Sequence, residues 1–249
     1  MPDRAFSEPV LAELYDVLNS SRTDYDFYLD VVLAAPRVLD VGCGTGELLI
    51  SARKAGHQGQ LSGLDPAAAM LVQARRRAPD IEWLLGDLRT HRWQRAFDAV
   101  VMTGHAFQVL LGDDELRSAL TTVRSALADD GRFVFETRNP AARAWERWTP
   151  EHVREVRYGD GESATVRVWD EVELPLRGDR VTFTETFETA AWPRPRTSRS
   201  TLRFLTPEAL SGFLTEAGLR IETQYGDWDR SPLTETSPEI ITVAVRADA

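Results

Sequence analysis

A glycine-rich loop between an apolar strand and a helix is the feature that most constrains the fold of this chain. Residues 36–41 read as the strand, and Gly42-Cys43-Gly44-Thr45-Gly46 follows as the loop. Glycines let the backbone turn sharply and let a ligand approach without a clash against Cβ atoms. The amino end of the next helix adds free N–H groups and favours an anionic group. The loop therefore predicts a ligand-binding turn at one edge of a parallel sheet.

The residues around this loop alternate between short apolar runs and helical stretches, which is typical of a parallel sheet covered by helices. Strands are expected at residues 36–41, 60–64, 81–85, 97–102, 132–137, 219–225 and 239–246. Helices are expected at residues 47–55, 67–78, 113–127 and 206–217. A chain of 249 residues with this pattern is long enough for one α/β domain with a substantial core.

Residues 138–205 interrupt this pattern with a period of two. Val166 and Val168 alternate with Thr165 and Arg167, and Gly178-Asp179 supplies a turn between two such runs. This alternation suits an antiparallel sheet with one buried face and one solvated face. We therefore expect a β-rich insert after the fifth strand.

Charge and composition restrict the partners and the compartment. The formal net charge of −10 disfavours a nucleic-acid substrate, and the run Arg75–Arg77 is interpreted as a solvated helix end. A single cysteine, Cys43, excludes an intramolecular disulfide and fits a reducing compartment. Neither a signal peptide nor a membrane-spanning run is recognisable. We expect a cytoplasmic protein without a nucleic-acid or membrane partner.

The spacing of the loop glycines distinguishes two classes of cofactor. Dinucleotide-binding enzymes prefer G-x-G-x-x-G. Here the third glycine comes one residue early, at Gly46, and Glu47 occupies the dinucleotide position. A carboxylate beside a pyrophosphate would be unfavourable. The spacing therefore favours a nucleoside cofactor without phosphates over NAD, although a nicotinamide oxidoreductase is kept as a rival hypothesis.

Acidic residues after the second and third strands complete a site for adenosine. Asp65 can accept hydrogen bonds from both ribose hydroxyls. Asp87 can accept one from the adenine amino group, while the backbone N–H of Leu88 can donate to the ring. Pro66 and Met70, one helical turn apart, can enclose the adenine from its two faces.

Together these residues resemble the class I S-adenosylmethionine (SAM)-dependent methyltransferases. The resemblance rests on residues 38–46, 64–66, 86–88, 97–101 and 127–133, which occur in the expected order. It implies a Rossmann-like mixed sheet of seven strands, ordered 3-2-1-4-5-7-6 with the seventh antiparallel, with helices on both faces. It implies SAM as cofactor and S-adenosylhomocysteine as product. No metal is expected, because the histidines and Cys43 lack metal-ligand spacing. The expected cofactor contacts are Tyr15, Tyr25, Asp40, Gly42, Cys43, Gly44, Gly46, Asp65, Pro66, Met70, Gly86, Asp87, Leu88, Met102, Thr103 and Gly104.

Leu14-Tyr15-Asp16, Asp24-Tyr25 and the β-rich insert look like the small-molecule subgroup, which includes sugar N-methyltransferases and antibiotic-tailoring enzymes. The resemblance implies a helical lid at residues 1–34, a SAM-binding core at 35–137 and 206–249, and an acceptor-binding insert at 138–205. We expect methyl transfer to an O or N atom of a small molecule, with a homodimer left open. A catalytically silent SAM-binding module and a protein methyltransferase are the alternatives.

His105, just beyond the fourth strand, is the candidate general base because histidine titrates near neutral pH. The competing interpretations are that it packs against the cofactor or is a satisfied polar residue of the loop. An amine acceptor that arrives neutral needs no base. The candidate acceptor-binding residues are Glu136, Arg138, Asn139, Trp145, Trp148 and Trp228.

Overall fold

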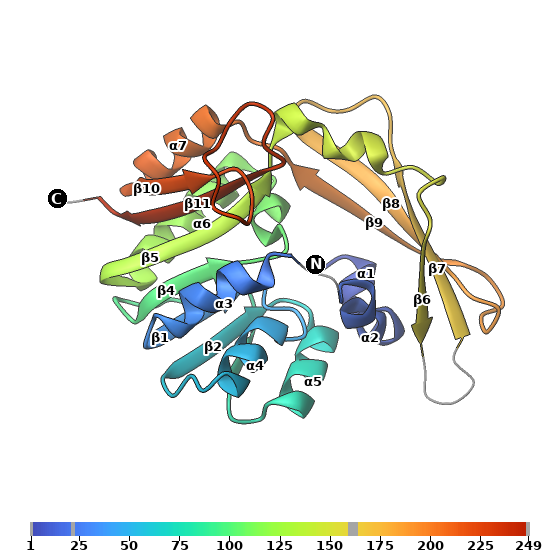
Figure 1. The fold of residues 1–249 in the computed structure, drawn as a ribbon, viewed down its shortest axis with the longest axis horizontal. Helices are drawn as coiled ribbons and strands as arrows, with labels where there is room; N and C mark the ends of the chain where they lie inside the picture. The colour runs from blue at the N-terminus through green and yellow to red at the C-terminus, as the bar shows by residue number, and fades with distance from the viewer. Residues whose placement is uncertain (1, 21–22, 159–163, 248–249) are drawn as a thin grey trace.

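The structure, a computed structural model, describes residues 2–20, 23–158 and 164–247 and contains two β-sheets (Figure 1). The larger sheet has the order β10-β11-β5-β4-β1-β2-β3. Its strands are β1 (Arg37–Val41), β2 (Gln60–Asp65), β3 (Glu82–Leu85), β4 (Phe97–Met102), β5 (Leu127–Arg138), β10 (Leu219–Tyr225) and β11 (Glu239–Arg246). Strands β1 to β5 pair in parallel, and β11 is antiparallel to both of its neighbours. The predicted strand order is confirmed.

Helices cover both faces of this sheet. One face packs against α3 (Tyr25–Leu33), α4 (Glu47–Lys54) and α5 (Ala68–Arg77), and the other against α6 (Asp113–Ala126) and α7 (Pro207–Glu216). Successive residues of a strand supply the two cores: Val38 is buried on the side of α4, and Leu39 on the side of α6. Burial on both faces explains why the central strands read as continuous apolar runs.

Strand β5 is longer than predicted. It begins at Leu127, directly after α6, whereas the strand was expected to begin at residue 132. Phe97 pairs with Leu127 and Ala99 with Arg132, so the pairing register of β4 and β5 shifts between them. The polar run Ala128-Asp129-Asp130-Gly131 therefore forms a bulged stretch of strand.

The insert forms the second sheet, an antiparallel meander of order β6-β7-β8-β9. Its strands are β6 (Arg154–Tyr158), β7 (Ala164–Val172), β8 (Arg180–Glu188) and β9 (Arg196–Arg203), and residues 159–163 of the predicted insert lie outside the described residues. Val166, Val168 and Phe187 point to one face and are buried there. The predicted period of two and antiparallel pairing are confirmed.

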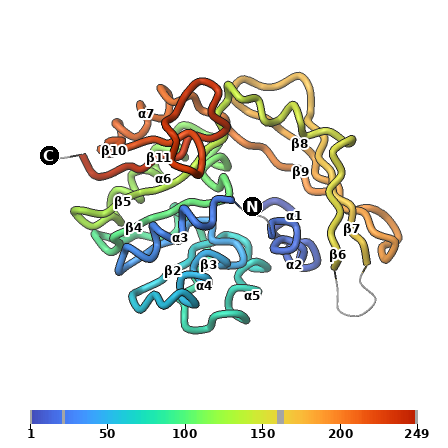
Figure 2. The backbone as a smooth tube through the Cα atoms, viewed as in Figure 1, coloured from blue at the N-terminus to red at the C-terminus, as the bar shows by residue number. Residues whose placement is uncertain are grey.

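The N-terminal helices α1 (Arg4–Ser7) and α2 (Pro9–Leu18) lie between the two sheets (Figure 2). Leu11 and Leu14 pack against the buried face of the insert, and the backbone N–H of Ala5 donates to Ser198 Oγ at 2.8 Å. Residues 1 and 21–22 of the predicted lid lie outside the described residues. Among the residues that are described, no helix combines the length and hydropathy needed to cross a bilayer.

The two ends of the insert meet at one buried side chain. Gln108, in the 3-10 helix η1 (Ala106–Val109), is only 1% exposed. Its Oε1 accepts from the backbone N–H of Arg138 at 3.3 Å, and its Nε2 donates to the carbonyl of Arg203 at 2.9 Å. One buried glutamine thus forms hydrogen bonds with the backbone at both ends of the insert, at Arg138 and at Arg203.

Candidate active site

The glycine loop between β1 and α4 is held by the carboxylate of Asp65. Its Oδ2 accepts from the backbone N–H of Gly44 at 2.8 Å, and its Oδ1 accepts from that of Ala67 at 2.7 Å. Burial raises the pKa of Asp65, and these two hydrogen bonds oppose the rise. Gly42, Gly44 and the third glycine all have positive φ, between 55° and 79°, so the loop depends on glycine for its conformation.

The early third glycine has a packing reason that the sequence did not reveal. A Cβ atom at Gly46 or at Gly63 of β2 would overlap the indole of Trp83 on β3. The Trp83 Nε1–H donates to the carbonyl of Ala78 at 2.8 Å, which fixes the ring in place. The glycine loop and strand β2 therefore both pack closely against the indole of Trp83.

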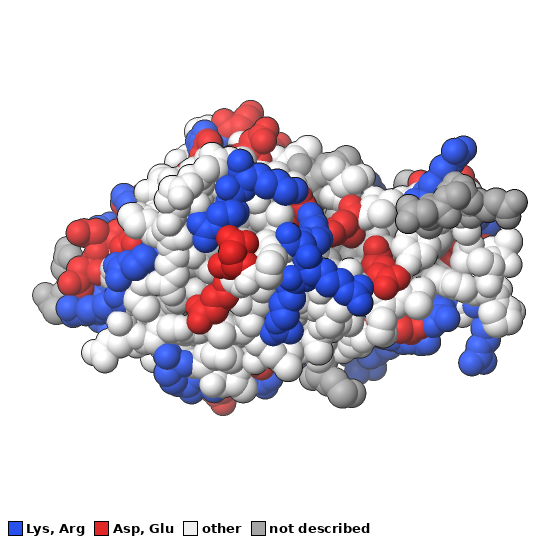
Figure 3. Space-filling view, turned by 90° about the horizontal axis from the view of Figure 1, so that it is seen from below, with Lys and Arg blue, Asp and Glu red and all other residues white. Residues whose placement is uncertain are grey.

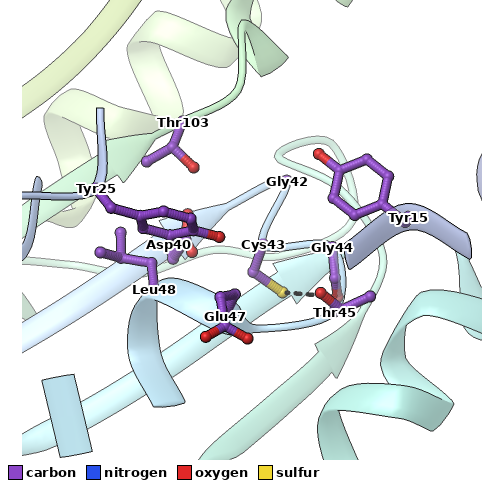
Figure 4. Close-up of a pocket in the computed structure, with 10 residues that line it drawn as sticks. All are labelled: Tyr15, Tyr25, Asp40, Gly42, Cys43, Gly44, Thr45, Glu47, Leu48 and Thr103. Atoms are coloured by element: carbon purple, nitrogen blue, oxygen red, sulfur yellow. Dashed lines mark hydrogen bonds between the residues drawn. The ribbon is translucent and has the colours of Figure 1, made fainter. Parts of the chain in front are cut away.

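A small cavity opens above this loop (Figure 4). Its volume is about 20 Å³, room for roughly one water molecule. The rings of Tyr15 and Tyr25 lie on either side of the loop. The structure thus brings together seven of the predicted cofactor contacts and adds Thr45, Glu47 and Leu48. The lining residues are Tyr15, Tyr25, Asp40, Gly42, Cys43, Gly44, Thr45, Glu47, Leu48 and Thr103.

Polar contacts fasten the N-terminal helix α2 over the loop. Thr45 Oγ1 donates to Asp16 Oδ1 at 2.5 Å. Arg77, at the end of α5, pairs with Asp16 at 2.8 Å and also with Glu47. These contacts place the ring of Tyr15 against Gly44.

The residues predicted to enclose an adenine do not share one open face. Met70 is 1% exposed and packs with Ala12 of α2, while Pro66 is exposed. Their part in cofactor binding stays a prediction, and it requires α2 to move. The helix face that carries Met70 is covered by a segment that lies far away in the sequence.

The turn after β3 presents a carboxylate held as an anion. The Asp87 Oδ1 accepts from the backbone N–H of Arg89 at 2.8 Å, and Oδ2 pairs with its guanidinium at 2.5 Å. The hydrogen bond from Arg89 lowers the pKa of Asp87. Gly86 has a φ of 146°, and the side chain of Leu88 is buried in the core.

The turn after β4 carries His105 in a left-handed conformation. Met102 and Thr103 are buried, and Gly104 and His105 have φ values of 65° and 62°. The backbone N–H of His105 donates to Glu136 Oε1 at 2.6 Å. Glu136 is fully buried, and burial raises its pKa. Its Oε2 accepts from the hydroxyl of Tyr28 on α3.

Glu239 is a functional candidate that the sequence did not reveal. Its two carboxylate oxygens lie 3.0 and 3.1 Å from His105 Nε2. Burial raises the pKa of Glu239 to about 7. In the antiparallel register of β11 and β5, Glu239 lies opposite Arg138, and therefore at the sheet edge where β4 ends. That position depends on strand pairing, so a single sequence carries little signal for it.

The predicted acceptor-binding residues separate into two groups. Trp145 and Trp148 contact Phe204 with ring centroids 4.7 and 6.1 Å apart, and the Arg138 guanidinium lies 5.2 Å from the Trp148 ring centroid. Trp228 instead packs 5.9 Å from Tyr28. Trp145, Trp148 and Arg138 therefore lie on the side of the insert, whereas Trp228 lies beside α3.

Asn139 has a clear structural task. Its Nδ2 donates to the carbonyl of Ser237 at 2.8 Å, and its Oδ1 accepts from the backbone N–H of Ala141 at 3.1 Å. The side chain is 3% exposed and fastens the loop before β11. Its predicted contact with an acceptor stays a prediction.

Charged side chains of both signs are interspersed on the face seen from below (Figure 3). In the arginine run at the end of α5, Arg77 pairs with the carboxylates of Asp16 and Glu47. Within the described ranges, no group of three or more His, Cys, Asp or Glu side chains is arranged to hold a metal ion.

Comparisons with known proteins agree with this geometry. The family described as a methyltransferase domain matches residues 38–131. The chain is 36% identical over 135 residues to dTDP-3-amino-3,6-dideoxy-alpha-D-glucopyranose N,N-dimethyltransferase of Streptomyces fradiae, which covers 51% of this chain and 52% of that protein. It is 27% identical over 228 residues to dTDP-4-amino-2,3,4,6-tetradeoxy-D-glucose N,N-dimethyltransferase of Saccharopolyspora spinosa, covering 86% and 87%.

Among solved structures, SAM-bound CalS10, an amino pentose methyltransferase from Micromonospora echinaspora, superposes with a TM-score of 0.68. It is 26% identical and covers 92% of this chain and 94% of its own. The chain spans about half or less of the length of the first curated relatives that it matches. These findings confirm the resemblance that the five sequence motifs predicted.

Proposed function

We propose that this chain, a class I methyltransferase fold of the kind found in sugar N-methyltransferases, transfers the methyl group of SAM to a nitrogen or oxygen atom of a small acceptor. The observation that carries the proposal is the charge of the cavity above the glycine loop. Two carboxylates, Asp40 and Glu47, line it, of which Glu47 is also paired with Arg77, and none of the described lining residues is Lys or Arg. Such a lining disfavours a pyrophosphate and suits a cation.

The residues of this cavity and of the neighbouring strand ends fit SAM, which carries a sulfonium and an ammonium group. Asp65 lies at the end of β2, where a ribose would meet its carboxylate, and Asp87 is held as an anion at the end of β3. Tyr15 and Tyr25 offer ring faces to a cation, an interaction worth about 0.5–2 kcal/mol. The loop can approach the turn after β4 because Gly42 lacks a Cβ atom, which would overlap Ala106.

When bound, SAM supplies a methyl group on a positively charged sulfur, which is already electrophilic. The chain therefore has to orient the acceptor and exclude water rather than activate the methyl group. The N-terminal helices and the insert act as walls around the acceptor, and His105 takes up a proton where the acceptor must lose one. This scheme assigns residues 1–34 to a lid and residues 138–205 to acceptor binding.

An amino sugar is the first acceptor to test. The relatives from S. fradiae and S. spinosa are named for dTDP-linked amino sugars. Trp148 and Arg138 supply a flat surface and a cation between the insert and the core, and Glu239 supplies a carboxylate. Homodimer formation and a cytoplasmic location stay predictions.

Ligand-dependent thermal shifts test the cofactor directly. Ligands that bind only the folded state raise the melting temperature. SAM and S-adenosylhomocysteine should raise it, and NAD(P) should not. Asp65→Ala should abolish the SAM shift, while Asp129→Asn, at an exposed position in the bulged stretch of β5, should retain it. A shift with NAD(P) and none with SAM would contradict the proposal.

Transfer of a radiolabelled methyl group then tests the activity. Label should appear in at least one member of a panel of nucleotide-linked and free amino sugars. SAM binding without transfer to any small molecule or protein would indicate a silent binding module. Transfer only to protein would indicate a protein methyltransferase.

A further inference from the structure

We infer that Glu239 is a positioning residue for His105: its carboxylate accepts the Nε2–H of the ring and thereby presents Nδ1 as the proton acceptor. The inference deepens the proposed methyl transfer and rests on it. Glu239 lies 134 residues from His105 in the chain, and strand β11 brings the two together.

A hydrogen bond to a buried carboxylate holds the backbone of His105 in an uncommon conformation. Residues with φ above zero are uncommon outside glycine, and His105 adopts a φ of 62°. The hydrogen bond from its N–H to Glu136 Oε1, at 2.6 Å, supports this conformation. Glu136 is itself held by the hydroxyl of Tyr28. Two buried side chains, Glu136 of β5 and Tyr28 of α3, therefore fix the position of the His105 backbone from which the imidazole extends.

The ring is then oriented by a two-point contact. Nε2 lies 3.0 Å from Glu239 Oε2 and 3.1 Å from Oε1, with both side chains largely enclosed. An ionised carboxylate only accepts hydrogen bonds, so Nε2 must carry the hydrogen. A neutral imidazole has one N–H, and its second nitrogen then carries the lone pair. The contact therefore selects the tautomer whose basic nitrogen is Nδ1.

The charges around Glu239 influence the pH range in which its carboxylate is ionised and can accept the hydrogen bond from His105. Arg138, opposite it on β5, favours the ionised carboxylate, whereas Asp227 and Asp24 disfavour it. Glu136 and Tyr28 approach from the other side of His105. Arg138 is also within the electrostatic reach of Asp170 on the insert. Because burial raises the pKa of Glu239 to about 7, the ionised pair is complete above neutral pH.

In the proposed reaction, methyl transfer to the acceptor is followed by proton transfer to His105. A lone pair on the acceptor nitrogen forms the bond to the methyl carbon, and the carbon–sulfur bond breaks with its electron pair remaining on sulfur. The methylated ammonium then gives its proton to His105 Nδ1. The resulting imidazolium faces the anionic Glu239, which stabilises it electrostatically. For a hydroxyl acceptor, the same nitrogen takes the proton as the bond forms.

Histidine ring NMR tests the positioning without an acceptor. In ¹⁵N-histidine protein at about pH 8.5, the His105 signals, assigned by their loss in His105→Asn, should show a protonated Nε2. In Glu239→Gln, the pKa of His105 should fall by about one unit or more, because the nearby anion is lost. Glu239→Asp should restore part of it. Glu222→Gln, at the Arg132 pair on the same sheet, serves as the control.

Kinetics complete the test. With an acceptor found in the methyl-transfer panel, Glu239→Gln should lower kcat about tenfold or more while leaving the Kd of SAM within about twofold. A protonated Nδ1 in the wild type, or an unchanged His105 pKa in a folded Glu239→Gln variant, would overturn the inference. Failure of SAM to bind would instead refute the proposed function and leave the ring measurement standing.

Discussion

Arg77 at the end of α5 pairs with Asp16 of α2 at 2.8 Å, and the same guanidinium also reaches Glu47 at the start of α4. Asp16 in turn accepts the hydroxyl of Thr45 at 2.5 Å. The cavity beneath encloses only about 20 Å³, much less than a nucleoside needs. We therefore expect cofactor entry to separate α2 from the glycine loop, against the contacts that Arg77 and Thr45 make with Asp16.

Replacing Arg77 with alanine should loosen this attachment. Each of its partly exposed ion pairs contributes about 0.2–1 kcal/mol, so the Kd of SAM should weaken roughly two- to tenfold, mainly through faster dissociation. Stopped-flow fluorescence of the N-terminal tyrosines measures the rates. Arg76→Ala, a neighbour that is exposed and forms no ion pair among the described residues, should leave them unchanged. Equal effects of both substitutions would contradict the assignment.

Gln108→Ala should destabilise the junction between the core and the insert. It removes the hydrogen bonds to Arg138 and leaves the carbonyl of Arg203 without its donor. Loss of a buried partner costs about 1–3 kcal/mol. Urea unfolding should show a decrease of that size in the free energy of unfolding. For the exposed Gln58→Ala we expect less than about 0.5 kcal/mol.

His105→Asn should slow methyl transfer more than it weakens cofactor binding. Asparagine tolerates the left-handed backbone at this position, so the turn is preserved. Removal of a general base lowers kcat on the order of 10²-fold, whereas the Kd of SAM, measured by calorimetry, should change little. Unchanged turnover would remove His105 from the role of base and would mean that the acceptor loses its proton to solvent.

Glu185→Gln should stabilise the fold at alkaline pH. Burial, and then the neighbouring Asp170, raise the pKa of Glu185 from 4.5 to about 7 against the opposing effect of Arg154. The folded state therefore holds a proton that the unfolded state releases, and stability falls as the pH rises from about 4.5 to about 7. At pH 8 the variant should gain about 1–3 kcal/mol over the wild type.

Near pH 5 most of that gain should disappear, because Glu185 is then protonated in the folded wild type. Urea unfolding at the two pH values measures the difference. Glu188→Gln, on the same strand and paired with Arg167 in solvent, should change the stability by less than about 0.5 kcal/mol at either pH. A gain that is the same at both pH values would show that proton binding is not its cause.

Much of the core was predictable because its strands are buried on both faces and its turns carry proline, aspartate or glycine. The strands β4 (Phe97–Met102), β10 (Leu219–Tyr225) and β11 (Glu239–Arg246) were predicted to the residue, and the starts of α6 and α7 to within one residue. The start of β5 was not, since Asp129-Asp130-Gly131 has the composition of a turn, yet the strand already begins at Leu127, which pairs with Phe97 of β4. Tertiary pairing overrides local propensity at that point.

The candidate site likewise contains residues that local spacing predicts and residues that only tertiary contacts bring together. The glycine loop and Asp65 lie next to one another through a single βαβ unit, and local spacing is enough to predict them. Glu239 reaches His105 only through the register of β11 on β5. Met70 was expected on an open helix face, but α2 covers it. In both cases the decisive neighbour is more than fifty residues away in the chain.

The glutamine at position 108 has an evolutionary consequence. Because one core side chain receives both strand ends of the insert, the four-stranded sheet leaves and re-enters the seven-stranded half of the molecule at a single place. Under the proposed function, a duplicated copy of this gene could exchange or reshape the sheet and acquire a different substrate while the glycine loop stayed intact. Diversification in such a lineage would concentrate between Arg138 and Arg203.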